Sequence, residues 1–191
     1  MIELDAYAAD CRLYGSVDLG EGRLTDLLNA DEELRIVDAR LESLLDGHVT
    51  ESPELTVARE ELFAVVAAGP RGATARRLHT HTRRIVVELG PFQVSGAIHG
   101  TAASNPLAGV LRRAPWVPLT DAVISYSRGS AYIGDEIPTL LINRSLASSI
   151  RAATEARAPI LPWEGSGAPR VAAPGALDLT SDVHQEPAAG K

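Results

Sequence analysis

The chain has 191 residues, and 45% of them are hydrophobic, which is enough apolar material for a buried core. Aromatic residues make up only 4% and the net charge is −7, so broad stacking surfaces for single-stranded nucleic acid are disfavoured. No apolar run approaches the roughly 20 residues that span a bilayer, and the first residues do not resemble a leader peptide, so we expect a cytoplasmic protein without membrane contacts.

Residues 1–70 are predicted to form a β-rich unit. Ile2, Leu4 and Ala6 alternate with polar residues, and this period of two places them on one face of a strand. The next strand runs through Gly15. A glycine inside a strand pattern indicates a bulge or a close backbone crossing, as expected in a strongly bent sheet.

A short helix and two further strands complete this unit. The segment RLTDLLN at 23–29 has apolar residues at helical spacing, and we expect Asn29 to end the helix in the left-handed conformation. The strand that follows passes through Asp38. A carboxylate there most simply satisfies backbone N–H groups in a turn, and a catalytic role is the weaker alternative.

A basic linker at residues 71–82 leads into a second β-rich unit at residues 83–152. Its strands, helix and strands follow the order of the first unit, with Gly96 inside a strand and Asp121 at the start of a later one. Asn105 is placed to cap the helix. A tail rich in Pro, Ala and Gly at residues 153–191 is expected to be disordered, because it lacks a periodic apolar pattern.

The two units match position by position. Gly15 and Gly96 are 81 residues apart, whereas Asp38 and Asp121 are 83 apart, a difference that two inserted residues in a loop explain. Four later positions recur at a spacing of 85, where Pro53, Leu55, Val57 and Arg59 match Pro138, Leu140, Ile142 and Arg144. We therefore predict a duplication in which the paired glycines and aspartates are structural repeat positions.

The motifs of both units resemble DUF6812, a bacterial domain family of unknown function. The first unit carries RLTDLLN at 23–29, and the second carries WVPLTDAVI at 116–124 and LINR at 141–144. This resemblance implies a tandem duplication of that domain and no particular activity. A weaker similarity at the level of the fold connects each unit with Sm-like barrels, which are bent five-stranded sheets.

The predicted fold class is thus mainly β with short helices. We expect two tandem small β-barrel-like repeats, similar to Sm and SH3-like barrels, in a pseudo-twofold arrangement. Each unit has about 70 residues, a size at which an independent domain is marginal, so the two are expected to share an interface.

Charge divides unevenly along the chain. Residues 1–70 hold 16 acidic and 5 basic residues, whereas residues 71–152 hold 4 acidic and 10 basic residues. Opposite charges favour docking of one unit on the other, or association between chains. The candidate interaction surface consists of arginines, which either face the acidic unit or bind phosphates: Arg71, Arg76, Arg77, Arg83, Arg84, Arg112 and Arg113.

Catalytic and metal-binding patterns are weak in this sequence. His79 and His81 share a strand face, but two imidazoles without a third ligand nearby do not make a metal site. The acidic run at 31–33 is typical of a solvated face, and Cys11 is interpreted as a small buried hydrophobe. We expect no cofactor and no metal, and an enzymatic role is disfavoured.

The function predicted from sequence is a non-enzymatic binding or assembly module that acts through protein–protein contacts or self-association. The alternative is an Sm-like protein that binds nucleic acid through its arginine-rich linker. An acidic molecule repels nucleic acid, so we favour a protein partner.

Overall fold

The computed structural model describes residues 1–68, 80–101, 105–110, 112 and 114–153, all within one compact unit. Most of the predicted linker and nearly all of the predicted tail lie outside these residues. The elements are β1 (Ile2–Ala8), β2 (Cys11–Val17), α1 (Leu24–Ala30), β3 (Glu33–Ser43), β4 (Val49–Ala58), η1 (Arg59–Glu61), β5 (Leu62–Val66), β6 (Thr80–Leu89), β7 (Phe92–Thr101), α2 (Pro106–Val110), β8 (Trp116–Arg128), β9 (Ala131–Asn143), η3 (Arg144–Leu146) and β10 (Ser149–Ala152).

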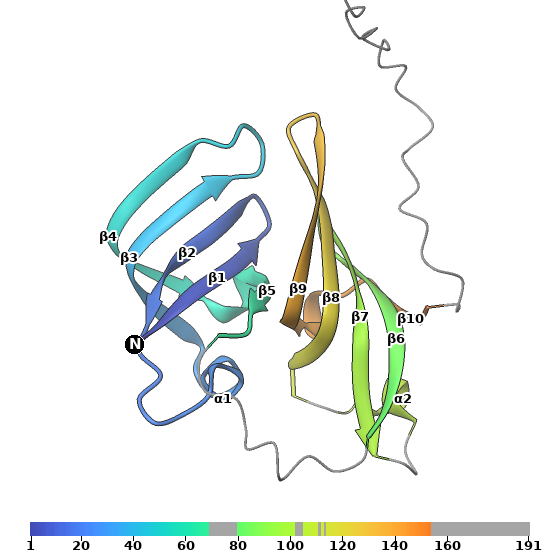
Figure 1. Ribbon diagram of the computed structural model, residues 1–191. Coiled ribbons are helices and arrows are strands. Elements are labelled where there is room, and N and C mark those ends of the chain that lie inside the picture. The colour runs from blue at the N-terminus through green and yellow to red at the C-terminus, as the bar shows by residue number, and fades with distance from the viewer. Residues whose placement is uncertain (69–79, 102–104, 111, 113, 154–191) are drawn as a thin grey trace, which may run out of the picture. The chain divides into compact units, whose positions relative to one another are not determined.

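The strands form one antiparallel sheet in the order β10-β6-β7-β8-β9-β5-β1-β2-β3-β4 (Figure 1). The prediction of a mainly β fold with few, short helices is confirmed. Strand β6 begins at Thr80, three residues before the expected start of the second unit.

The order of elements in residues 2–66 recurs in residues 80–152 as two strands, a short helix, two strands, a helical turn and a fifth strand. We call residues 1–68 the first half and residues 80–153 the second half. The order of strands in the sheet recurs too, as β5-β1-β2-β3-β4 in the first half and β10-β6-β7-β8-β9 in the second.

A bulge bends the first half where β2 meets β3. Gly15 stands opposite two residues, Asp38 and Ala39, and the pairing shifts there by one residue. Asp38 has a φ of 51°, in the left-handed region that aspartate tolerates better than most residues. An ideal Cβ on Gly15 would lie 2.9 Å from the carbonyl oxygen of Val37, so only glycine allows this approach. Pro53 of β4 faces the interruption, where its missing N–H removes no ladder hydrogen bond.

The same bulge recurs in the second half between β7 and β8. Gly96 stands opposite Asp121 and Ala122, Asp121 has a φ of 47°, and Pro138 of β9 faces the interruption. The two glycines therefore occupy matching surroundings. Both aspartates lie inside strands with exposed side chains, so the prediction that they lie in turns is wrong. Their role is to adopt the left-handed backbone conformation that the bulge requires.

Each half contributes side chains to the core of the other. Tyr7, Leu44 and Ala64 of the first half belong to the core cluster formed mainly by the second half. Trp116 and Leu141 of the second half belong to the cluster formed mainly by the first. The expectation that the units share an interface is confirmed.

The structure tests two predictions about helix ends, the end of α1 at Asn29 and the start of α2 at Asn105. Asn29 does not adopt the left-handed conformation expected for it; α1 continues to Ala30 and the next residue is extended. The Asn29 side chain instead donates to the carbonyl of Thr25 and accepts a hydrogen bond at 3.2 Å from the backbone N–H of Trp116. The cap predicted for α2 is confirmed, since the Asn105 side chain accepts from the N–H of Leu107.

Candidate functional site

The two halves are joined edge to edge. Strand β5 of the first half pairs with β9 of the second, with Ala64 opposite Ile142, Val65 opposite Leu141 and Val66 opposite Leu140. The N–H of Ala67 extends this ladder by donating to the carbonyl of Thr139 at 2.9 Å. All six paired residues are apolar, and five of them are buried. We call this ladder and its surroundings the internal junction.

An aromatic cluster fills one side of the internal junction. Tyr7 and Phe63 of the first half meet Phe92 and Tyr126 of the second half in edge-to-face or tilted contacts, with ring centroids 5.6 to 5.9 Å apart. Such pairs add about 0.5–1.5 kcal/mol each beyond the area that they bury. In a chain with few aromatic residues, this concentration identifies the internal junction as a tightly packed region.

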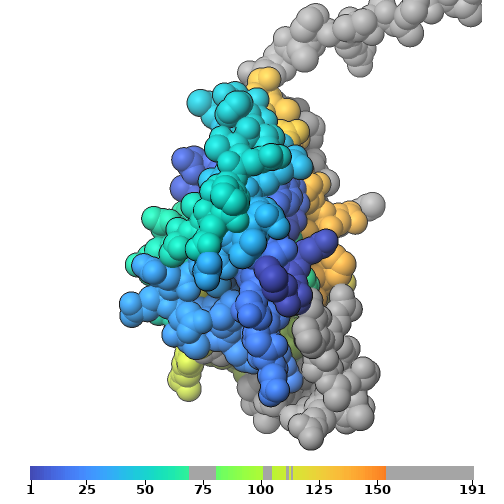
Figure 2. Space-filling model, turned by 90° about the vertical axis from the view of Figure 1, so that its left-hand side faces the viewer, coloured from blue at the N-terminus to red at the C-terminus, as the bar shows by residue number. Residues whose placement is uncertain are grey.

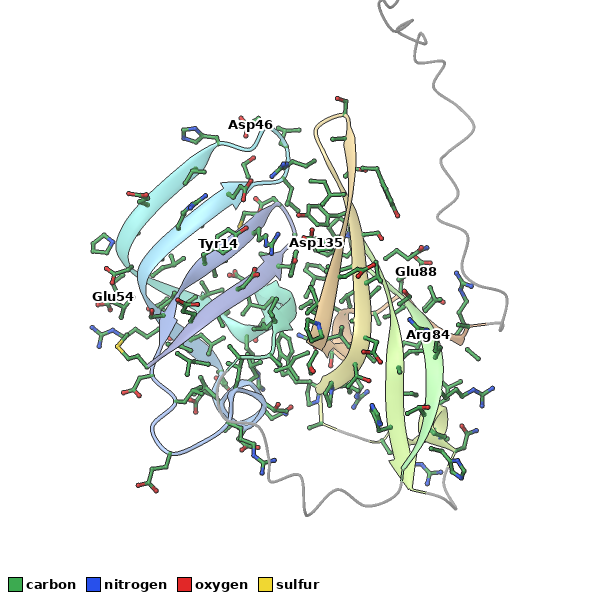
Figure 3. The ribbon with its side chains drawn as sticks, viewed as in Figure 1. Tyr14, Asp46, Glu54, Arg84, Glu88 and Asp135 are labelled. Atoms are coloured by element: carbon green, nitrogen blue, oxygen red, sulfur yellow. The ribbon has the colours of Figure 1, made fainter. Side chains whose placement is uncertain are left out.

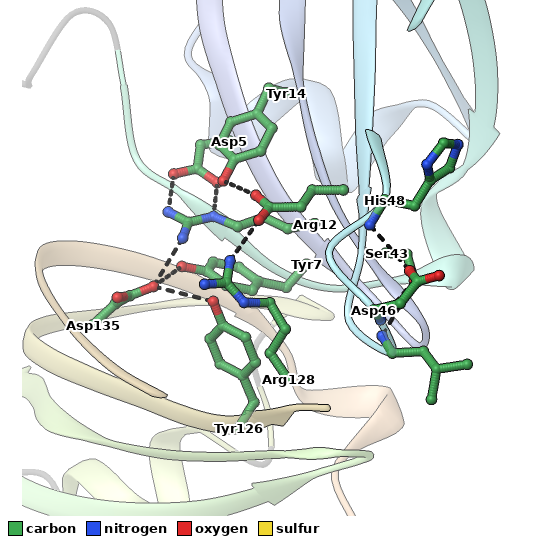
Figure 4. Close-up of polar contacts among 12 residues, drawn as sticks. Asp5, Tyr7, Arg12, Tyr14, Ser43, Asp46, His48, Tyr126, Arg128 and Asp135 are labelled. Carbon is green, nitrogen blue, oxygen red and sulfur yellow. Dashed lines mark hydrogen bonds and ion pairs between the residues drawn. The ribbon is translucent and has the colours of Figure 1, made fainter. Parts of the chain in front are cut away.

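An ionic cluster borders these rings (Figure 4). The Arg12 guanidinium donates two hydrogen bonds to the Asp5 carboxylate, at 2.8 and 2.9 Å, and a third at 2.9 Å to Asp135 across the junction. The hydroxyl of Tyr7 donates to the same Asp135 oxygen at 3.2 Å, and that of Tyr126 lies 3.5 Å from it. Asp135 is therefore the acceptor on which donors from both halves converge.

The tyrosines beside this cluster are weak acids. Burial is the main cause that raises the pKa of Tyr7 and of Tyr126, and nearby carboxylates raise both further. Burial likewise raises the pKa of Tyr14 to about 12. A phenol with a raised pKa stays protonated near neutral pH and acts as a hydrogen-bond donor, so this chemistry suits holding the halves together better than catalysis.

A second polar contact between the halves lies where the β8–β9 hairpin meets the β3–β4 loop. The Gly129 N–H donates to the carbonyl of Leu44 at 3.0 Å. Arg128 forms an ion pair with Glu42 (Figure 4). Together with the Asn29–Trp116 hydrogen bond, these contacts fix the internal junction at several separate points.

Two strands end the sheet with one side unpaired among the described residues, β4 in the first half and β10 in the second. The residues of β4 lie on the surface that Figure 2 faces. The charges around the two edges are opposite. Exposed carboxylates lie on or beside β4 at Glu33, Glu51, Glu54, Glu60 and Glu61. Exposed guanidiniums lie on β10 and the neighbouring β6 at Arg83, Arg84 and Arg151, and just after α2 at Arg112. Glu54 is paired with Arg35, and Arg151 with Glu88. Glu54 and Arg84 mark these two ends in Figure 3.

The predicted arginine surface is placed in part. Arg83, Arg84 and Arg112 are exposed in the second half, whereas Arg71, Arg76, Arg77 and Arg113 lie outside the described residues. The sequence predicts that these arginines face the acidic unit of the same chain or of a neighbour, and the position of β6 does not favour the same-chain contact for Arg83 and Arg84. In the sheet, β7, β8 and β9 separate β6 from the first half, and Arg84 donates to the backbone carbonyl of Asp121.

The other candidates do not assemble into a site. His81 is exposed and His79 lies outside the described residues, which contain no cluster of three potential metal ligands. A hollow of about 400 Å³ beside α1 is lined by Val17, Asp18 and Leu27 among others, and neither Asp38 nor Asp121 reaches it. Burial, together with the neighbouring Asp10, raises the pKa of Cys11 to about 11, so its thiol is a weak nucleophile at neutral pH.

Sequence reasoning missed the ionic cluster. Arg12 and Asp135 are 123 residues apart, and neither belongs to a local motif. The aromatic residues were a weak signal of where the halves meet. The chain has eight, and half of them lie in the aromatic cluster: Tyr7, Phe63, Phe92 and Tyr126.

Comparisons of the chain with protein-family models, curated proteins and solved structures found no match. The resemblance to DUF6812 and to Sm-like barrels therefore stays a prediction. None of the helices in the described residues is long and apolar enough to cross a membrane.

Proposed function

We propose that this chain is a non-enzymatic binding or assembly module that engages a protein through the unpaired edges of its sheet. The observation that carries the proposal is a pair of strands, β4 and β10, that have one side open among the residues that the structure describes, at the two ends of a sheet whose halves are themselves joined edge to edge. An open strand presents a row of unpaired N–H and C=O groups, which an extended segment of another protein can pair with.

The proposed architecture is two barrel-like repeats in tandem. Matching element order, matching strand order and matching bulges at Gly15 and Gly96 support it. The strand order does not support the pseudo-twofold relation. A twofold axis would pair equivalent edges, whereas β5 is the fifth strand of its half and β9 is the fourth. We therefore propose that the repeats follow each other head to tail.

A proline scan of the edges tests this function. In the internal junction, Leu141 of β9 pairs with Val65 of β5. The repeat position that corresponds to Leu141, 85 residues earlier in the sequence, is Thr56 of β4. The Thr56 N–H is then directed outward, and Thr56→Pro removes a donor from the open edge while sparing the ladder to β3. Thr56→Ala keeps the N–H and is the matched control. Ile150→Pro, with Ile150→Val as its control, performs the same test on β10.

The measurement is retention of protein partners by the immobilised full chain, together with light scattering for self-association. We expect wild type and both controls to retain a partner or to self-associate, and at least one proline variant to lose that contact while its circular dichroism is unchanged. A chain that stays monomeric and retains nothing would refute the proposal, as would a partner that both proline variants keep.

Nucleic-acid binding is the second candidate, and the exposed cluster of Arg83, Arg84 and Arg112 favours it. Filter binding at two salt concentrations tests it, because neutralised phosphates release counterions and make affinity fall steeply with salt. Absence of binding at low salt, or binding that survives Arg83→Ala with Arg84→Ala, rules it out.

A further inference from the structure

We propose that the partner of the open edges is a second copy of this chain, with β10 of one copy pairing with β4 of the next in the register of the internal junction. This inference rests on the proposed edge-binding function and adds to it the partner, the strand register and the polarity of assembly.

The internal junction is a template for the contact. It joins β5, the fifth strand of its half, to β9, the fourth strand of the other half. The strands left open are the remaining fourth strand, β4, and the remaining fifth strand, β10. The chain therefore carries both components of the same contact a second time, at opposite ends of one sheet. Because these edges differ from each other, pairing between copies is head to tail.

The register follows from the repeat spacing of 85 residues. Ala64 opposite Ile142 becomes Ser149 opposite Val57 of the next copy, and Val65 opposite Leu141 becomes Ile150 opposite Thr56. The Ala67 N–H that donates to Thr139 corresponds to Ala152 donating to the Glu54 carbonyl. Hydrogen-bonded and non-hydrogen-bonded pairs alternate in an antiparallel ladder, so Ser149 and Val57 form a non-hydrogen-bonded pair with closely spaced side chains.

Charge complementarity supports the same pairing. Arg151 lies exposed on β10, where it also contacts Glu88, and Glu51 and Glu54 lie exposed on β4, where Glu54 also contacts Arg35. A more specific pair comes from the Asn29–Trp116 hydrogen bond of the internal junction. Positions related to these by the 83-residue spacing are Arg112 and Glu33, which are both exposed and carry opposite charges, so the same pairing would bring a basic and an acidic residue to this point of the contact.

The contact between copies is expected to be weaker than the internal junction. Tyr7 and Asp135 correspond to Glu88 and Thr50 at the outer edges, and Leu141 corresponds to Thr56, so the aromatic and ionic clusters are not repeated there. We therefore expect reversible association that increases with protein concentration. Since the outer charges are exposed, association should weaken as salt rises.

Mixing two single-cysteine variants tests the register and the polarity. Both are made in a Cys11→Ser background, one with Ser149→Cys and the other with Val57→Cys, and each change alters side-chain volume little. A disulfide needs Cα atoms roughly 4.4–6.8 Å apart, a range that facing non-hydrogen-bonded positions meet. Val49→Cys is the matched control, because it lies eight residues from position 57 on the same strand, roughly 27 Å away.

Under mild oxidation we expect a disulfide-linked dimer from the mixture of Ser149→Cys and Val57→Cys. Neither variant alone, nor the mixture with Val49→Cys, should form one. Dimers from either variant alone would indicate that equivalent edges pair, and would overturn the head-to-tail contact. Absence of dimers from the first mixture at the highest soluble concentration would overturn the inference.

A charge exchange provides a second measurement if a cysteine variant does not fold. Light scattering should show weaker self-association for Arg112→Glu and for Glu33→Arg, and recovery when both changes are in the same chain. Equal association in all four proteins would contradict the pairing. If self-association is absent but another protein is retained and is lost with Thr56→Pro or Ile150→Pro, this inference fails while the proposed function stands.

Discussion

Replacing Gly15 by alanine should destabilise the protein more than the same change at Gly96, although the two positions are equivalent in the repeat. An ideal Cβ on Gly15 would lie 2.5 Å from Ile36 Cγ2 and 2.9 Å from the carbonyl oxygen of Val37, which cannot rotate away. On Gly96 the closest atom is Leu119 Cβ at 3.0 Å, and the next are at 3.3 Å, so a small adjustment suffices.

The magnitudes follow from these contacts. Overpacking costs about 1–3 kcal/mol, and alanine returns about 0.4–1 kcal/mol by restricting the unfolded chain. We expect a net loss of about 2 kcal/mol for Gly15→Ala and less than about 1 kcal/mol for Gly96→Ala. With a urea m-value of about 2 kcal/mol/M, the first change shifts the unfolding midpoint by about 1 M.

Urea denaturation followed by circular dichroism measures both shifts. Gly134→Ala is the control, since its nearest neighbour would be Ser125 Oγ at 3.8 Å, an ordinary contact. Equal midpoints for Gly15→Ala and Gly134→Ala, or a larger loss for Gly96→Ala than for Gly15→Ala, would refute the assignment of Gly15 to a close backbone crossing.

Three further predictions concern the bulge, the ionic cluster and the thiol and phenol groups. Asp38→Asn should leave stability nearly unchanged and Asp38→Val should cost about 1–2 kcal/mol in urea denaturation, because a branched side chain resists the left-handed backbone. A double-mutant cycle of Arg12→Met and Asp135→Asn should give a coupling of about 1–3 kcal/mol, and additivity would show that the ion pair does not link the halves. Ultraviolet titration should place Tyr14 near pH 12. Because the folded pKa lies above the unfolded value of 10.0, the contribution of Tyr14 to the unfolding free energy should be constant below pH 10 and be lost as pH rises toward 12. Cys11, with a pKa of about 11, should react slowly with iodoacetamide at neutral pH, and a rate equal to that of the urea-unfolded chain would contradict its burial.

The internal plan of each half could be predicted from sequence because its signals are local. A glycine within an alternating strand marked each bulge, and the paired positions at spacings of 81, 83 and 85 residues marked the recurrence. The left-handed aspartates were found as recurring positions, but their conformation was not predicted. Aspartate is common both in turns and in bulges, and the sequence does not distinguish the two.

The contacts between the halves could not be predicted in the same way. The pairing of β5 with β9 depends on which of several open edges meet, and strand patterns do not encode that choice. The net charge of each half predicts attraction between the halves, but it does not predict which residues make the contacts. Two ion pairs cross between the halves. Arg128 of the basic half contacts Glu42 of the acidic half, as the charge division predicts, whereas Arg12 of the acidic half contacts Asp135 of the basic half.

Exchange of core residues has a consequence for synthesis of the chain on the ribosome. The first half is complete once Val66 has emerged, and β5 can pair with β1, but its other side has no partner strand until Ile142 is made, 76 residues later. At about 5–20 residues per second, this interval lasts roughly 4–15 s. During that time the side of β5 that later pairs with β9 is open, and the core of the first half lacks Trp116 and Leu141. We therefore expect the first half to be prone to misfolding until residue 142 has been made, and a pause in translation before that point to lengthen this interval.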